Sequence, residues 1–224
     1  MAVARSLIRS GPGGSDATAG PDERRQMARR SVDVAVILPD ASPVITLARL
    51  GRLDLFETFI APIRIVDQVE YEITKPANDP DGKISAWLAR MANRVSIVET
   101  LVGFGFRTKL ERGEAPKGGN LGEIAVDEYA TQLALAASPT FVPLVLFEDP
   151  DVLETRIARL PRVHLLNTAA WIRALADEGI ITDGQTLLND INAGRKSPMI
   201  PIERPGRTRR VQSKWLRKPS NDAG

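Results

Sequence analysis

The stretch VDVAVILPD, residues 32–40, followed by ASPVITLARLG, residues 41–51, decides the fold. Its first half is a nearly continuous run of valine, isoleucine and leucine, which is typical of a parallel strand covered on both faces. The run ends at Asp40, and Ser42 with Pro43 then supplies an N-cap and a first-turn proline for a helix that continues to Gly51. A buried strand that leads directly into a helix predicts the start of an α/β domain.

The alternation of strand and helix continues through the chain. Further strands are predicted at 63–66, 95–100, 140–149 and 163–167. Helices are predicted at 52–59, 67–74, 81–93, 121–137, 151–160, 168–179 and 183–194, with capping boxes formed by Asp67 and Glu70 and by Asn120 and Glu123. Residues 102–120, rich in glycine and lysine, are predicted to form a loop. The pattern predicts a three-layer α/β/α sandwich with a central, mostly parallel sheet.

Charge and composition divide the 224 residues into three parts. We expect a disordered extension at 1–31, one domain at 32–194 and a basic C-terminal tail at 195–224. The domain has 15 basic and 23 acidic residues, whereas 195–218 has nine basic residues and one acidic residue. We expect the tail to lie on the surface as an arm that binds phosphates, occupies the protein's own acidic groove, or aids solubility.

The composition excludes several classes of site and location. With no cysteine and a single histidine, His164, the chain has neither thiolate zinc sites nor multi-histidine metal sites, so any metal must be a hard cation held by oxygen ligands. We predict His164 to be a packed strand residue. No apolar run is long enough to span a membrane and no secretory signal is apparent, so we expect a cytoplasmic protein without membrane contact.

Acidic residues follow the predicted strands. Asp40 and Asp149 come directly after strands, and Glu123 lies in the first turn of a helix. Because ligands of parallel α/β sheets gather beyond the carboxyl ends of the strands, we expect these acids to converge. Converging carboxylates repel one another unless a divalent cation neutralises them, which favours Mg²⁺ or Mn²⁺ and a metal-activated water that attacks a phosphodiester.

Each of these acids also has a purely structural interpretation. Asp40 suits a turn or a cap, and a capping box alone explains Glu123. Asp127, one turn after Glu123, either shares the metal or faces solvent. Glu148, Asp149 and Asp151 together are also typical of a solvated loop.

Two further features leave alternatives open. The segment GFGFR, residues 103–107, is either a loop that stacks on nucleic acid or a turn that packs two phenylalanines on the core. Ser42 is an accessory candidate near Asp40, but no histidine partner supports it as a nucleophile.

At these residues the chain resembles the PIN-domain family. The resembling segments, in the family's order, are PDASPVITLARLGRLDLF, IRIVDQVEYEI, NLGEIAVDEYA, LFEDPDVLETRIA and VHLLNTAAWIRALADEGII. The Asp-Ala-Ser-Pro motif resembles especially the branch found with toxin–antitoxin modules. The resemblance implies a Mg²⁺- or Mn²⁺-dependent ribonuclease.

The resemblance also implies the metal ligands, namely Asp40, Glu72, Glu123 and Asp149. Phe-Glu-Asp stands where the family usually has an Asp-Asp pair, so the ligand after that strand is either Glu148 or Asp149, and we predict Asp149. Asp151 is a possible fourth acid, and Thr168 either orients a water or ligand or caps its helix.

We therefore expect a metal-dependent endoribonuclease with Asp40, Glu123 and Asp149 as catalytic residues. The expected substrate is RNA, and the protein is plausibly the toxin of a type II toxin–antitoxin pair, with a cognate antitoxin and a homodimer as possible partners. The alternatives are an RNA-processing or defence nuclease without an antitoxin, and a catalytically inactive module whose acidic groove receives a basic peptide.

Overall fold

A six-stranded sheet forms the centre of this computed structural model, which describes residues 33–114, 119–136, 141–193, 195–204 and 215–216. All of these residues belong to one compact unit, Ser31–Gly224. The strands are β1 (Asp33–Pro39), β2 (Ile63–Val66), β3 (Val95–Val98), β4 (Phe141–Phe147), β5 (His164–Asn167) and β6 (Glu203–Arg204). They lie in the order β3-β2-β1-β4-β5-β6, and neighbours are parallel except β5 and β6. The predicted α/β class with a mostly parallel sheet is confirmed.

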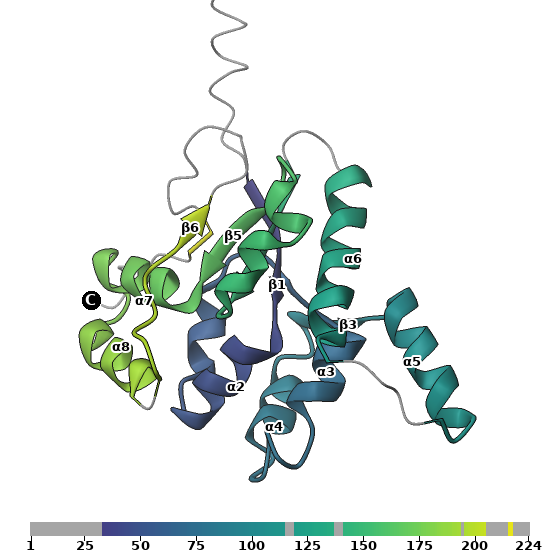
Figure 1. Cartoon of the computed structure of the whole chain (residues 1–224). Coiled ribbons are helices and arrows are strands. Elements are labelled where there is room, and N and C mark those ends of the chain that lie inside the picture. Colours follow the sequence, from purple (N-terminus) through teal and green to yellow (C-terminus); the bar gives the residue numbers. More distant parts are fainter. Residues whose placement is uncertain (1–32, 115–118, 137–140, 194, 205–214, 217–224) are drawn as a thin grey trace, which may run out of the picture. The chain divides into compact units, whose positions relative to one another are not determined.

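Helices flank the sheet, in keeping with the predicted three-layer α/β/α sandwich (Figure 1). The α-helices are α2 (Ala41–Arg49), α3 (Asp67–Ile73), α4 (Lys83–Arg90), α5 (Leu101–Glu111), α6 (Leu121–Ala136), α7 (Thr168–Asp177) and α8 (Gly184–Asn192). Shorter 3₁₀ helices are η1 (Leu53–Thr58), η2 (Pro150–Glu154) and η3 (Ile157–Arg159), where the sequence predicted longer helices. Among the described residues, no helix combines the length and apolar character needed to cross a membrane.

The strand order reverses between β1 and β4. The chain runs outward from β1 through β2 to β3, and then returns to place β4 on the other side of β1. Ile37 pairs with Leu144 and Pro39 with Leu146, so the carboxyl ends of the two strands lie side by side. A reversal of this kind leaves a crevice beyond the strand ends, because the chain leaves the two strands in opposite directions.

Three predicted helix starts differ from the structure. The helix after β1 begins at Ala41, with Asp40 rather than Ser42 at the N-cap position and no side-chain cap bond. Val66 precedes α3, and the Asp67 carboxylate instead accepts a 2.7 Å hydrogen bond from the Thr100 hydroxyl. Asn120 has a φ of 68°, in the left-handed region, rather than the extended backbone of an N-cap residue. Neither predicted capping box therefore describes the start of its helix.

Residues 101–111, predicted to be part of a loop, form α5. The two glycines of this segment lower its helix propensity. Tertiary contacts overcome that preference, since the Thr100 hydroxyl accepts from Gly103 N at 2.9 Å and the Glu128 carboxylate of α6 accepts from Leu101 N and Val102 N. A Cβ atom on Gly103 would lie 1.8 Å from Asp67 Oδ2, so this position requires glycine.

The segment after α8 is part of the domain rather than a separate arm. β6 pairs with β5, and the Asn167 amide donates to Ile200 O at 2.7 Å. Trp215 and Leu216 are buried, and Ile60 N donates to Trp215 O at 3.0 Å. Most of residues 195–204 are exposed, as predicted, but the segment is attached to the domain rather than forming a separate arm, and Trp215 and Leu216 are buried. Residues 205–214, 217–224 and the predicted extension at 1–31 lie outside the described residues.

Trp215 completes an aromatic cluster in the core. Phe59 stacks on Trp171 with ring centroids 4.6 Å apart, and Trp215 packs on the same phenylalanine at 5.8 Å. Phe56 joins this pair to Trp87 at 5.1 Å. The cluster attaches the C-terminal segment to the domain through burial of large rings.

We expect Trp215→Ala to lower the free energy of unfolding by about 3 kcal/mol, because it removes a large ring from a closely packed cluster. Trp215→Phe retains a ring beside Phe59 and should lose less. Urea denaturation of both variants measures the effect. Equal denaturation midpoints for Trp215→Ala and the unaltered protein would contradict the observed packing.

Candidate functional site

Two carboxylates lie at the reversal of strand order. Asp40 follows β1 and Glu148 follows β4, and both are buried. Asp40 N donates to Leu146 O at 2.8 Å, which ties the end of β1 to β4. The alternation of buried strands with helices thus places two acids where a parallel sheet ordinarily binds its ligands.

Two helices add further carboxylates. Glu72 projects from α3 and Glu123 from the first turn of α6. Gly122, which precedes Glu123, is buried, and a Cβ atom at that position would lie 3.4 Å from Glu72 Oε2 and 4.0 Å from Asp40 Oδ1. The carboxylates of Asp40 and Glu72 therefore approach the same point, and the glycine leaves room beside them.

Burial and like charge act together on Asp40. Burial is the main reason that the pKa of Asp40 is raised to about 7. A hydrogen bond from the Ala41 backbone acts in the opposite direction, and the charges of Glu123, Glu72 and Glu148 contribute to the rise. The site therefore stores repulsion that a proton or a cation would relieve.

The pKa of Glu123 is influenced by acids that follow β4. Burial raises the pKa of Glu123, and the charges of Asp149, Asp151 and Glu72 raise it further. Asp149 and Asp151 are exposed, and Asp149 Oδ1 accepts from Asp151 N at 2.9 Å. Asp40 and Glu123 are therefore influenced by different acids, Asp40 by Glu148 and Glu123 by Asp149 and Asp151, while Glu72 acts on both.

Arg195 is a residue of the site that sequence analysis did not single out. Its guanidinium forms an ion pair with Glu148 Oε2, which also accepts from the Thr46 hydroxyl at 3.0 Å. Glu148 Oε1 is buried and has no hydrogen-bond partner among the described residues. Of the three roles open to the basic tail, occupation of the protein's own acidic groove describes Arg195.

A cavity of about 490 Å³ opens beside these residues. It is lined by Ser42, Ile45, Thr46, Arg49, Glu72, Asn78, Glu148, Asp149, Pro150 and Arg195. The lining contains the carboxylates of Glu72, Glu148 and Asp149 and the guanidinium groups of Arg49 and Arg195. A cavity with both charges suits a ligand that is itself an anion and is bound together with a cation.

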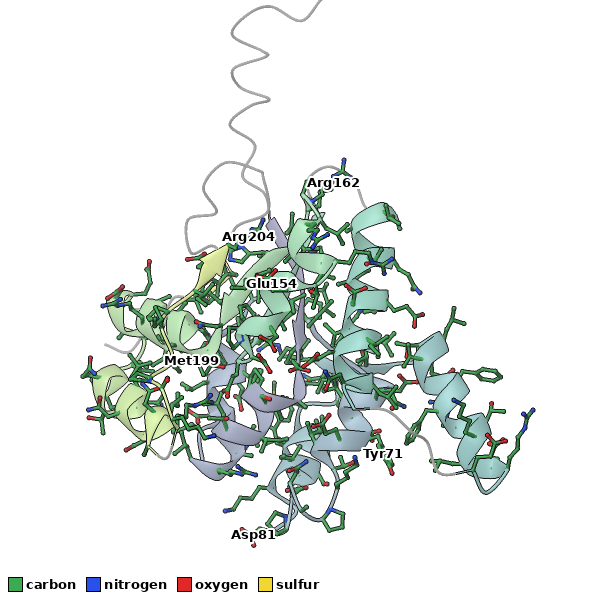
Figure 2. All side chains as sticks on the ribbon, viewed as in Figure 1. Tyr71, Asp81, Glu154, Arg162, Met199 and Arg204 are labelled. Carbon is green, nitrogen blue, oxygen red and sulfur yellow. The ribbon has the colours of Figure 1, made fainter. Side chains whose placement is uncertain are left out.

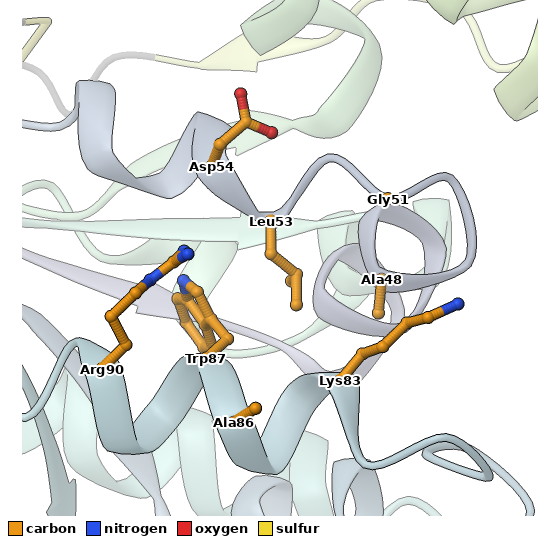
Figure 3. Close-up of a pocket in the computed structure, with 8 residues that line it drawn as sticks. All are labelled: Ala48, Gly51, Leu53, Asp54, Lys83, Ala86, Trp87 and Arg90. Atoms are coloured by element: carbon orange, nitrogen blue, oxygen red, sulfur yellow. The ribbon is translucent and has the colours of Figure 1, made fainter.

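Another hollow, of about 420 Å³, lies between α4 and the segment from α2 to η1, and contains none of these acids (Figure 3). Its floor is apolar and includes Trp87. The cations at its rim are already paired, Lys83 with Asp81 at 3.0 Å and Arg90 with Glu57 at 3.0 Å. We assign the chemistry to the acidic cavity because the carboxylates of Glu72, Glu148 and Asp149 line it.

The accessory candidates occupy different environments. Ser42 lines the acidic cavity. Asp127 forms an ion pair with Arg156 at 2.8 Å and accepts from Ile157 N at 3.0 Å, so its carboxylate stabilises η3. Thr168 is buried with no hydrogen-bond partner among the described residues, and Asn167 rather than Thr168 caps α7 by accepting from Ala170 N.

The donor set matches a hard cation in its chemistry. Every acidic ligand candidate offers oxygen, and Glu148 Oε1 is a buried acceptor without a partner. Within the described part of the chain, no three acidic or histidine side chains are already placed to hold one ion. A complete coordination shell would therefore require acidic side chains to move.

Comparison of the chain with protein-family models, curated proteins and solved structures finds no match. The chemistry of the site is therefore argued from its own side chains. The charges of Glu123, Glu72 and Glu148 act on Asp40, and those of Asp149, Asp151 and Glu72 act on Glu123.

In metal-free buffer, Asp40→Asn should stabilise the protein at pH 8 by up to about 4 kcal/mol, at about 1.4 kcal/mol per unit of pKa. The pKa of Asp40 is higher in the folded protein than its ordinary value of 3.8, so the folded state loses stability as the pH rises from about 4 to about 7. The asparagine variant lacks this loss. Urea denaturation at several pH values measures the difference, and a gain that does not grow with pH would count against the repulsion. Asp177→Asn, at an exposed carboxylate of α7, is the control.

We expect Arg195→Met to lower the free energy of unfolding by about 1–3 kcal/mol, because a buried carboxylate loses its charged partner. Combining it with Glu148→Gln should restore part of that loss. Lys196→Met, at the exposed neighbouring residue, is the matched control in urea denaturation. Equal effects of Arg195→Met and Lys196→Met would show that the ion pair does not stabilise the fold.

Proposed function

We propose that this protein is a Mg²⁺- or Mn²⁺-dependent endoribonuclease with a PIN-like site. The observation that carries the proposal is that Asp40, buried at the end of β1, has a pKa raised to about 7, mainly by burial and further by the charges of Glu123, Glu72 and Glu148. Their order along the chain agrees with the motifs that resemble the PIN-domain family. A divalent cation would convert this repulsion into attraction.

Asp40, Glu72 and Glu123 are the residues proposed to hold the metal, with Glu148 or Asp149 as the further ligand. When bound, the cation would lower the pKa of a water and stabilise negative charge on a phosphate. The bond from Asp40 N to Leu146 O fixes the backbone of Asp40 at the end of β1. Burial of Asp40 strengthens its interaction with positive charge because little water screens it.

The arginines of the cavity have a complementary role in this proposal. Arg195 lies on Glu148, and Arg49 lines the same cavity. A guanidinium can bind two phosphate oxygens at once, so these side chains would orient the phosphodiester against the carboxylates. The toxin role, an antitoxin partner and a homodimer remain finer proposals within the same function.

A second candidate function has one specific observation in its favour. The acidic cavity already contains an arginine of the same chain, paired with Glu148. A catalytically inactive module would use the same carboxylates to hold an arginine or lysine of a basic peptide. The two functions differ in whether the acids bind Mn²⁺ and whether the protein cuts RNA.

Incubation of a fluorescently labelled single-stranded RNA with Mn²⁺ tests the main proposal. We expect cleavage that a chelator abolishes, and losses greater than the roughly 100-fold typical of outer-shell changes in Asp40→Asn and Glu123→Gln. Comparison of Glu148→Gln with Asp149→Asn identifies the further ligand, and Asp177→Asn is the surface control. Mn²⁺ binding without cleavage in the unaltered protein would refute the nuclease, and absence of both would favour the peptide-binding module.

A further inference from the structure

A second cavity adjoins the carboxylates on the side of α5. It has a volume of about 360 Å³ and lies between α3, α5 and the start of α6. Its lining is Gln68, Tyr71, Glu72, Lys75, Phe106, Leu110, Gly119, Asn120, Leu121 and Gly122. Glu72 borders this cavity and the acidic cavity alike, and Gly122 lies beside Asp40. A ligand in the second cavity is therefore next to the carboxylates.

The lining has the chemistry of a base-binding site. Tyr71, labelled on α3 in Figure 2, meets Phe106 of α5 with ring centroids 4.9 Å apart and a 60° angle between the planes. Lys75 Nζ lies 4.6 Å from the centroid of the Tyr71 ring. Unpaired bases bind proteins by stacking on aromatic rings and by hydrogen bonds to their edges, and the side-chain amides of Gln68 and Asn120 supply both donors and acceptors.

The position of Phe106 is fixed by contacts at the start of α5. Arg107 forms an ion pair with the buried Asp67 at 2.9 Å, and Asp67 also accepts from Thr100. Glu128 holds the first amides of the helix from α6. Phe106 therefore faces α3 on an anchored helix, whereas Phe104 of the same helix is 64% exposed and is not part of the lining.

We propose that the cavity formed by Tyr71, Phe106 and Lys75 binds one unpaired base of a single-stranded RNA. This inference rests on the proposed function, because it assigns the substrate as single-stranded and places one of its bases beside the phosphate that the carboxylates receive. Glu72 lies between the two cavities, so the base and the adjoining phosphate occupy neighbouring positions. The Lys75 ammonium contributes positive charge for the RNA backbone.

The test uses a ten-nucleotide single-stranded RNA that carries one 2-aminopurine, in buffer without divalent cations, so that binding is measured apart from cleavage. Stacking quenches this fluorophore, and we expect its emission to fall when the protein binds. Tyr71→Ala with Phe106→Ala should abolish the quenching and weaken binding by about 5- to 100-fold, the range that stacking of one base supplies. The same RNA with an abasic position in place of the 2-aminopurine should bind the unaltered protein with a similar loss.

Two matched variants distinguish binding in the cavity from nonspecific binding to α5. Tyr71→Phe keeps the ring and should retain the quenching, and Phe104→Ala removes an exposed ring outside the cavity and should leave binding unchanged. Quenching that persists in the Tyr71→Ala, Phe106→Ala variant, or an equal loss from Phe104→Ala, would overturn the base site. Quenching that depends on Tyr71 in a protein that cuts no RNA would refute the nuclease and retain the base site. Cleavage of RNA by the unaltered protein, together with unaltered binding in the double variant, would retain the nuclease and refute the base site.

Discussion

Repulsion among buried carboxylates is the constraint on which the rest of the site depends. The backbone of Asp40 is held at the end of β1 by the sheet itself, through Asp40 N and Leu146 O. Burial is the main cause of its raised pKa, the backbone of Ala41 offsets part of the effect, and Glu123, Glu72 and Glu148 raise the pKa further. A fold that needed stability alone would gain by replacing one of these acids with an apolar residue, because burial of unpaired charge is unfavourable. Such strain at the strand reversal is typical of a site that awaits a positively charged ligand.

The surrounding structure is adapted to this concentration of charge. Gly122 leaves the space beside the carboxylates of Asp40 and Glu72 that any larger residue would fill. Arg195 comes from the C-terminal segment and pairs with Glu148, which is buried at the end of β4. That segment is held in turn by Asn167, which binds both Ile200 and Ile202, and by the burial of Trp215. The charge of the site and the packing of a chain segment distant in sequence are therefore coupled.

Features of the fold that depend on neighbouring residues could be predicted from the sequence, whereas features that depend on residues distant in sequence could not. Strands such as Ile63–Val66 were predicted with the observed bounds because a run of apolar residues is a local property. Asp40, Glu123 and Asp149 could be selected because strand ends and helix starts of a parallel sheet meet at one edge. α5 was missed because Glu128, Asp67 and Thr100 hold it from elsewhere, against the preference of its glycines. The contacts of Arg195 and Trp215 could not be predicted from the sequence. The basic composition of the C-terminal segment indicates that it can bind acidic groups, but it does not identify which residue makes the contact.

The shared wall between the two cavities limits how a ligand can lie. Glu72 faces Asp40 on one side and borders the Tyr71 and Phe106 cavity on the other. A nucleotide whose base occupied the aromatic cavity would have its phosphate within reach of Glu72, because that residue borders both cavities. Asp149 lines the acidic cavity and is exposed, and its charge together with that of Asp151 would attract a cation to the site. Its position in both linings makes Glu72, rather than the exposed aspartates, the residue that would link recognition of a base to chemistry at its phosphate.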